Sequence, residues 1–174
     1  MEGKSAFALT PPFFVRAEIA EKEGWKPCFS GQEVDVLRGR MLHNDSHKFE
    51  SRFLGLTIPT NRSVMFGSLS GSKLGIWVAH GEGKFSLPYD EDHYNIVAKY
   101  TYDEYPGNPN GSDYSAAAIA SPDGRHLAIM PHLERAIFPW QNAYYPADRL
   151  HHDEVTPWIE AFVNARKWVE EKTR

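Results

Sequence analysis

The chain has 174 residues, about the length of a single domain, and its formal net charge of −4 provides no basic field for binding nucleic acid. Its 41% hydrophobic and 24% charged residues are typical of a soluble globular protein, and no apolar run approaches the roughly 20 residues that cross a bilayer. The single cysteine, Cys28, excludes an internal disulfide and fits a reducing compartment. Because the N-terminal residues also lack the pattern of a signal peptide, we expect a cytoplasmic protein.

The first part of the chain differs in character from the rest. Residues 6–15 are apolar but interrupted by two prolines, and the charged residues 18–23 favour a short helix. Residues 34–37 follow a turn and favour a short strand. We therefore expect an atypical N-terminal segment, residues 1–38, before the main body, residues 39–174.

The next part of the chain favours β-structure. Residues 49–58 alternate loosely between apolar and polar side chains, and residues 96–102 alternate cleanly, as half-buried strands do. Lys73–His80 is apolar and lies between Gly71 and Gly81, which predicts a buried strand that ends on a polar residue.

An irregular stretch and a hairpin follow. Pro and Gly dominate Tyr105–Gly111, which excludes regular structure there. Ala116–Ala120 and His126–Met130 are predicted strands, and the Pro-Asp-Gly within Ser121–Arg125 is a strong signal for the tight turn between them.

The C-terminal residues give the clearest helix signal. Thr156 suits the N-cap and Pro157 the first helical position, and cationic residues gather toward the C-terminal end, where the helix dipole favours them. The apolar residues of the predicted buried face are Trp158, Ile159, Phe162, Val163 and Val169. Because strands outnumber helices and this helix must pack on a sheet, the fold class is α/β or α+β.

Three polar segments stand where chemistry is plausible, and the first is Ala79-His-Gly-Glu-Gly83. Glycines on both sides of a carboxylate, with an imidazole before it, let the backbone approach a ligand closely. His80 and Glu82 are therefore candidates for substrate binding. A polar turn after a buried strand explains the same residues equally well.

The second segment is Tyr105-Pro-Gly-Asn-Pro-Asn-Gly-Ser112. Two asparagines among glycines are able to line a small polar pocket with side-chain amides and free backbone N–H groups. Asn108 and Asn110 are thus further candidates for substrate binding, while a plain surface loop is the competing interpretation.

The third segment, Ile129–Arg135, follows an apolar strand and contains His132 and Glu134. At this spacing a carboxylate is able to orient one ring nitrogen of the imidazole and leave the other free, as a general base for a nucleophile requires. The competing interpretation is a structural His–Glu pair.

The remaining histidines form no coherent metal site by spacing. His43 and His47 lie four residues apart without a third ligand at a recognisable distance. A metal-dependent hydrolase that uses His80, Glu82 and His132 is a weaker interpretation, because it assembles distant residues. No phosphate loop, Gly-x-Ser-x-Gly elbow or dinucleotide fingerprint occurs.

Four motifs occur in the order Asn44–Phe53, His80–Gly83, Tyr105–Ser112 and Met130–Arg135, and together they cover roughly residues 40 to 170. In this order they resemble the C-terminal class I glutamine amidotransferase domain of phosphoribosylformylglycinamidine synthases, which act in purine biosynthesis. The combination is more specific than any one of the motifs.

The resemblance implies a partial flavodoxin-like α/β sheet with flanking helices and a Cys–His–Glu triad. In such a triad the thiolate attacks the side-chain amide of glutamine, a glutamyl thioester forms, and ammonia passes to a separate synthetase domain. That domain uses ATP and magnesium to convert formylglycinamide ribonucleotide to the amidine, and no cofactor is expected in this chain. By the same resemblance, His132 is the triad histidine and Glu134 the acid that orients it.

The chain departs from the family pattern at two positions. Leu133 stands where proline is common, which changes backbone stiffness but removes no catalytic group. Cys28 lies in Lys26-Pro-Cys-Phe-Ser-Gly-Gln32 and not in the Gly-x-Cys-x-Gly-x-Gln elbow that presents the family's nucleophile. We therefore expect the C-terminal half of an amidotransferase domain, without the nucleophile and inactive on its own.

Half of such a domain exposes a sheet edge or apolar surface. This exposure favours self-association or pairing with the remainder of the synthase, which means the elbow-bearing half and the synthetase domain. A non-catalytic binding or assembly module on an amidotransferase scaffold is the alternative function.

Overall fold

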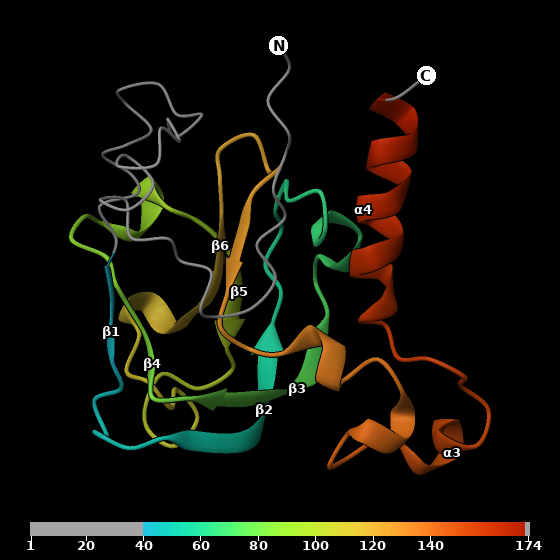
Figure 1. Ribbon diagram of the computed structural model, residues 1–174, viewed down its shortest axis with the longest axis horizontal. Helices are drawn as coiled ribbons and strands as arrows, with labels where there is room; N and C mark the ends of the chain where they lie inside the picture. Colours follow the sequence, from blue (N-terminus) through green and yellow to red (C-terminus); the bar gives the residue numbers. More distant parts are fainter. Residues whose placement is uncertain (1–39, 173–174) are drawn as a thin grey trace, which may run out of the picture.

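The structure, a computed structural model, describes residues 40–172 (Figure 1). The helix predicted for residues 18–23, the strand predicted for residues 34–37 and Cys28 lie outside the described residues. The boundary placed at residue 38 stays a prediction.

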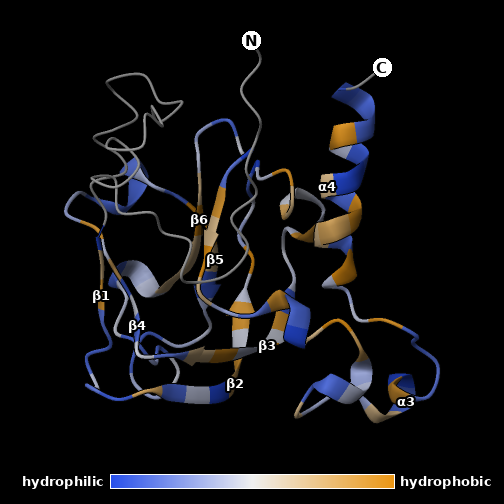
Figure 2. Ribbon diagram, in the orientation of Figure 1, coloured by the Kyte–Doolittle hydropathy of each residue, from blue (hydrophilic) through white to orange (hydrophobic). Residues whose placement is uncertain are grey.

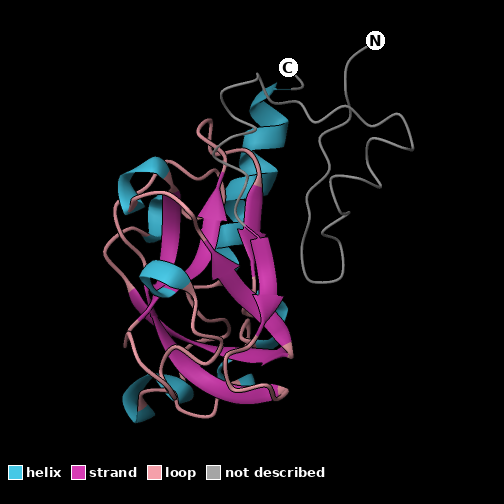
Figure 3. Ribbon diagram, turned by 90° about the vertical axis from the view of Figure 1, so that its left-hand side faces the viewer, coloured by secondary structure: helices cyan, strands magenta, loops and turns pink. Residues whose placement is uncertain are grey.

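Seven strands in the described part of the chain form two antiparallel sheets (Figure 1). β1 and β4 form a small sheet, and the other five strands pair in the order β3-β2-β5-β6-β7. β2 pairs with β3 along its whole length but with β5 only through Leu56 and Thr57, so the larger sheet curls (Figure 3). The strands are β1 (Arg40–His43), β2 (Glu50–Thr57), β3 (Lys73–His80), β4 (Glu82–Ser86), β5 (Asn95–Tyr100), β6 (Ala116–Ala120) and β7 (Leu127–Ile129).

The longest helix in this part of the chain is α4 (Ile159–Lys172), which lies beside the larger sheet and contacts the short helix η1 (Figure 1). The helix begins two residues after Pro157, the predicted first helical position. The hydroxyl of Thr156 accepts a hydrogen bond from the backbone N–H of Trp158 at 3.3 Å, in the turn that leads into the helix. The other helices are the 3₁₀ helices η1 (Gly67–Leu69), η2 (Glu91–His93), η3 (Asp113–Ser115), η4 (Leu133–Arg135) and η5 (Pro139–Gln141), and α3 (Ala147–Leu150).

The main hydrophobic core fills the space between the larger sheet and α4. Trp158 is 1% exposed, stacks at a tilt on Phe66 and donates from its indole N–H to the carbonyl of Gly75 at 2.8 Å. Figure 2 shows hydrophobic residues along β5 and β6, and a mixture of hydrophobic and hydrophilic residues on α4. The helix is therefore amphipathic and closes one face of the sheet.

The α/β class predicted from the sequence is confirmed, although every strand pair among the described residues is antiparallel. The strands predicted at 73–80 and 116–120 match the observed bounds, and the predicted hairpin turn contains Gly124 with φ +73. The sequence did not predict β1 or β4, which are short and partly polar. On the predicted buried face of α4, Val169 is 40% exposed.

Candidate functional site

His132 is held in place by β3 and not only by its own neighbours in sequence. Its backbone N–H donates to the carbonyl of Trp77 at 2.8 Å, which makes an isolated antiparallel bridge between these two residues. The chain then turns through η4, and this turn brings the carboxylate of Glu134 back to the imidazole. Nδ1 of His132 and Oε1 of Glu134 lie 2.8 Å apart.

This contact leaves the second nitrogen of the ring available. A carboxylate at Nδ1 favours the tautomer in which Nδ1 carries the proton and Nε2 carries the lone pair. Nε2 of His132 is buried and has no hydrogen-bond partner among the described residues, whereas about half of the Glu134 side chain is exposed. The geometry is the one that a general base requires.

His80 and Glu50 form a second pair of buried polar side chains close to this turn. They lie directly opposite each other on β3 and β2, and they are 4% and 3% exposed. One oxygen of Glu50 contacts the guanidinium of Arg52 at 2.6 Å. The other oxygen and both ring nitrogens of His80 have no partner among the described residues.

The pKa of His80 is lowered to about 4, chiefly by burial and to a smaller extent by the nearby His132, while Glu50 opposes the shift. His80 is therefore neutral at pH 7. A buried polar group without a partner is uncommon in native proteins, because its desolvation is not compensated. Glu50, His80 and His132 carry such atoms at this end of the sheet, and so does Asn44, whose amide donates to the carbonyl of His80 at 2.7 Å. These atoms thus identify a site that is incomplete among residues 40–172.

In the motif His80–Gly83, packing against the His80 ring explains why position 83 is a glycine. A Cβ atom at Gly83 would lie 2.6 Å from Nδ1 of His80, so only glycine fits against this ring. Glu82, the other candidate in the motif, lies on the exposed side of β4, and its carboxylate is 3.4 Å from Nδ1 of His43. His80 thus points inward, while Glu82 faces solvent.

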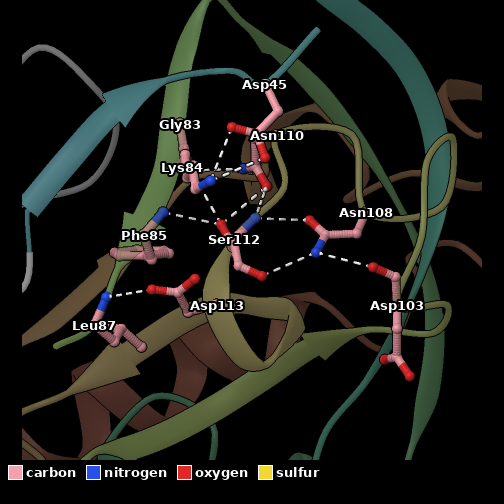
Figure 4. Close-up of polar contacts among 10 residues, drawn as sticks. All are labelled: Asp45, Gly83, Lys84, Phe85, Leu87, Asp103, Asn108, Asn110, Ser112 and Asp113. Carbon is pink, nitrogen blue, oxygen red and sulfur yellow. Dashed lines mark hydrogen bonds and ion pairs between the residues drawn. The ribbon is translucent and has the colours of Figure 1, made fainter. Parts of the chain in front are cut away.

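Asn108 and Asn110 lie in a different environment, where Asn108 braces the loop that contains both residues and Asn110 joins this loop to β4 (Figure 4). The amide N–H of Asn110 donates to the carbonyl of Gly83 at 2.6 Å and to the Tyr100 hydroxyl at 3.2 Å. Its amide oxygen accepts from Ser112 at 2.9 Å. Burial raises the pKa of Tyr100, which keeps this phenol neutral.

The same network extends on both sides of Asn110 (Figure 4). Asn108 donates to the carbonyl of Ser112 at 2.9 Å and accepts from its backbone N–H at 3.1 Å. Lys84 reaches both carboxylate oxygens of Asp45, at 2.8 and 2.9 Å. We call this group the polar clasp, and its members are Asp45, Gly83, Lys84, Asn108, Asn110 and Ser112.

The sequence predictions did not include two residues that shape the site, Glu50 and Trp77. Glu50 left a signal: it stands in phase with Leu54 and Leu56, on the inward side of an alternating strand, where a carboxylate is unexpected. No pattern in the sequence pointed to Trp77, because it contacts His132 through its backbone carbonyl, which any residue has.

Residues 22–169 match the model of the CobB/CobQ-like glutamine amidotransferase domain. The chain belongs to this family. It is 42% identical over 162 residues to the probable phosphoribosylformylglycinamidine synthase, chloroplastic/mitochondrial, of Arabidopsis thaliana, covering 84% of this chain and 11% of that protein. It is 38% identical over 142 residues to the human phosphoribosylformylglycinamidine synthase, covering 74% of this chain and 10% of that one.

A solved structure supports the same assignment. The chain resembles the structure of PurLQS from Thermotoga maritima with a TM-score of 0.56 and 27% identity, covering 77% of this chain and 54% of the matched chain. The resemblance inferred from the four motifs is therefore confirmed. This amidotransferase domain spans about a tenth of the length of the curated relatives it matches.

Two further findings concern metals and membranes. Within residues 40–172 no group of three or more His, Cys, Asp or Glu side chains is placed to hold a metal ion, so this part offers no ligand set for a metal-dependent hydrolase. None of the helices described here is long and apolar enough to cross a bilayer. The expected cytoplasmic location stays a prediction, and the name of the Arabidopsis relative assigns that protein to plastids or mitochondria.

Proposed function

We propose that this domain supplies the histidine and the acid of a Cys–His–Glu glutaminase site in a phosphoribosylformylglycinamidine synthase. The ammonia released there serves the ATP-dependent amidination of formylglycinamide ribonucleotide, in a synthetase portion that binds ATP and magnesium. The observation that carries the proposal is the 2.8 Å contact between Nδ1 of His132 and Glu134, which leaves a buried Nε2 with no partner within residues 40–172.

The proposed reaction uses Nε2 of His132 as a proton shuttle. Nε2 takes the proton of the nucleophilic thiol, and the thiolate attacks the carboxamide carbon of glutamine. Nε2–H then protonates the departing nitrogen as the C–N bond breaks, which releases ammonia and leaves a glutamyl thioester. Water, deprotonated at Nε2, cleaves the thioester to glutamate, and the thiol is restored. Glu134 stabilises the imidazolium and fixes its tautomer.

The nucleophile is proposed to come from the elbow-bearing half of a longer polypeptide. Among the residues predicted to bind glutamine, His80 has the strongest support, because its neutral ring is buried near His132 and neither nitrogen has a partner in the part of the chain that the structure describes. For Glu82, Asn108 and Asn110 this role remains a prediction from the sequence. The amides of the two asparagines already hydrogen-bond within the polar clasp.

A chimeric synthase tests the proposal. Residues 40–172 replace the corresponding segment of the Arabidopsis relative, and product formation is measured with glutamine and, separately, with ammonia. We expect His132→Asn to lower the glutamine-dependent rate by about 10³-fold and Glu134→Gln by about 10²-fold, because general acid–base catalysis is lost or weakened. The ammonia-dependent rate reports the folding of the synthetase portion. A glutamine-dependent rate that survives His132→Asn would instead favour the non-catalytic binding or assembly module.

The isolated chain is expected to release no glutamate from glutamine, since it lacks the elbow. Turnover that disappears on Cys28→Ala would overturn this expectation and would make Cys28 the nucleophile.

A further inference from the structure

The end of β3 brings together three buried polar side chains whose hydrogen-bonding groups are only partly used within the described residues. His80 is the last residue of β3, and Glu50 lies directly opposite it on β2. Asn44 joins them, because its backbone N–H donates to the carbonyl of Gly81 at 2.9 Å and its side-chain amide donates to the carbonyl of His80 at 2.7 Å. Asn44, Glu50 and His80 are each at most 4% exposed.

Most of the groups left unpaired in this cluster are acceptors. The amide nitrogen of Asn44 donates to the carbonyls of Lys48 and His80, which fixes the amide so that its oxygen is the atom without a partner in residues 40–172. One oxygen of Glu50 likewise has no partner there. The neutral ring of His80 adds one acceptor nitrogen and one N–H donor. We call Asn44, Glu50 and His80 the acceptor cluster.

The carboxylate of Glu50 is held by a cation at one oxygen only. The Arg52 guanidinium contacts that oxygen at 2.6 Å and donates to the hydroxyl of Tyr105 at 2.9 Å. It also lies over the Tyr105 ring, 4.9 Å from the ring centre. These contacts fix the guanidinium on one side of the carboxylate, so the second oxygen stays available to a donor on the side of the acceptor cluster.

The polarity of the acceptor cluster selects the kind of ligand that completes it. Buried acceptors are satisfied by a group with several N–H donors, and a carboxylate oxygen binds most strongly to a donor that is positively charged. An ammonium group has three such donors, whereas an ionised carboxylate has none. A metal ion is a poorer match, because within residues 40–172 no three His, Cys, Asp or Glu side chains are placed to hold one.

We propose that the acceptor cluster binds the α-ammonium group of glutamine, and that Glu50 makes the site specific for an α-amino acid over a simple carboxamide. This inference rests on the proposed function, in which the carboxamide of the same molecule reacts beside His132. His132 lies near enough to His80 to lower the pKa of that ring. Because only two methylene groups separate the α-carbon of glutamine from its carboxamide, one molecule reaches both places.

Glutaramate, which is glutamine without its α-ammonium group, tests the role of Glu50. In the chimeric synthase, kcat/KM for hydrolysis of the carboxamide is measured with glutamine and with glutaramate. We expect the unchanged domain to prefer glutamine by about 10³-fold or more, because a site built to hydrogen-bond a substrate group rejects the analogue that lacks it. Glu50→Gln should lower kcat/KM for glutamine about 10²-fold and leave the value for glutaramate within about twofold, since only glutamine carries the charge that Glu50 binds.

The control separates this role from a general effect on the fold. Glu91→Gln changes an exposed carboxylate that also pairs with a cation, Lys99, and should leave both kcat/KM values unchanged. Equal losses for the two substrates in Glu50→Gln would mean that Glu50 only supports the fold, and would overturn the proposed subsite. Glu50→Asp guards against a variant that does not fold, because it keeps the negative charge and should retain a clear preference for glutamine.

Two further outcomes keep this inference separate from the proposed function. If the unchanged domain uses glutaramate as well as glutamine, the subsite is wrong whatever the variants do. If His132→Asn abolishes glutamine use but Glu50→Gln keeps the full preference for glutamine, the subsite fails and the proposed function stands. If instead His132→Asn leaves glutamine use intact, the proposed function fails, and the inference that rests on it fails too.

Discussion

Two polar regions of this domain carry its most distinctive motifs, and they differ in how their polar groups are paired. In the polar clasp, the side-chain amide of Asn108 hydrogen-bonds within its own loop, and the amide of Asn110 also bonds to Gly83 of β4. At the His132 turn, buried nitrogens of His80 and His132 and one oxygen of Glu50 have no partner among the described residues. Paired groups hold a fold together, whereas buried unpaired groups carry a desolvation penalty that a ligand or partner relieves. The polar clasp is therefore part of the scaffold, and the region around His132 is the candidate site.

The largest expected effect comes from breaking the clasp at its centre. Asn110→Ala removes hydrogen bonds to Gly83 and Ser112 and leaves buried groups unpaired, each at a penalty of about 1–3 kcal/mol. We expect a loss of roughly 4 kcal/mol in the free energy of unfolding, measured by urea denaturation.

The matched control for this change is Asn142→Ala, whose amide makes one exposed hydrogen bond and whose loss should have an effect below about 1 kcal/mol. Equal effects of the two substitutions would contradict a structural role for the clasp.

The free energy of unfolding should depend on pH because of His80, near the His132 turn. The pKa of His80 is about 4 in the folded domain against 6.5 for an unperturbed ring, so the unfolded chain binds more protons between these values. The stabilisation present above pH 6.5 is therefore lost as the pH falls toward 4, by about 3 kcal/mol in total.

Urea denaturation at a series of pH values measures this loss. His80→Phe should flatten the profile over this window, and the exposed His151→Asn should leave it unchanged. A profile that is the same in the domain and in His80→Phe would show that the ring is not buried as described.

Gly83 links the two regions, because it supports the ring of His80 and accepts a hydrogen bond from Asn110. Gly83→Ala forces a Cβ atom against His80 and should destabilise the domain by about 2 kcal/mol. Gly67→Ala is the control, since a Cβ there meets only one atom, at 4.0 Å.

Combining Gly83→Ala with His80→Ala tests the cause of this effect. Removal of the ring should recover most of the lost stability, and strict additivity of the two free-energy changes would rule out the proposed contact.

The smallest change in the free energy of unfolding is expected for substitution of Trp140, which is 77% exposed. Trp140→Ala should change the free energy of unfolding by less than about 0.5 kcal/mol, because most of this side chain is in solvent. Trp158→Ala, which removes a buried indole, should cost about 4 kcal/mol in the same thermal or urea measurement. A large loss of unfolding free energy for Trp140→Ala would mean that this side chain stabilises the domain despite its exposure.

Local patterns in the sequence were sufficient for much of the fold. The strand Lys73–His80 was predicted between its flanking glycines, and the hairpin around Gly124 from its turn residues, because strand alternation and turn geometry are properties of neighbouring residues. The spacing of His132 and Glu134 likewise predicted a contact that requires only one short turn. The small sheet of β1 and β4 was missed because its strands have four and five residues and few apolar side chains, which leaves little local signal.

The sequence by itself determined the class of the fold, the family motifs and the His–Glu spacing, all of which depend on residues close together in the chain. Only the tertiary structure decided which polar motif is paired and which is not. Asn110 meets Gly83 from 27 residues away, and His132 meets Trp77 across an isolated bridge between distant segments. The three polar segments look alike in sequence, since each is short, polar and placed at the end of a predicted strand or just after one. Whether a buried amide or imidazole is satisfied depends on which distant backbone groups the fold brings to it, and that separates the clasp from the site.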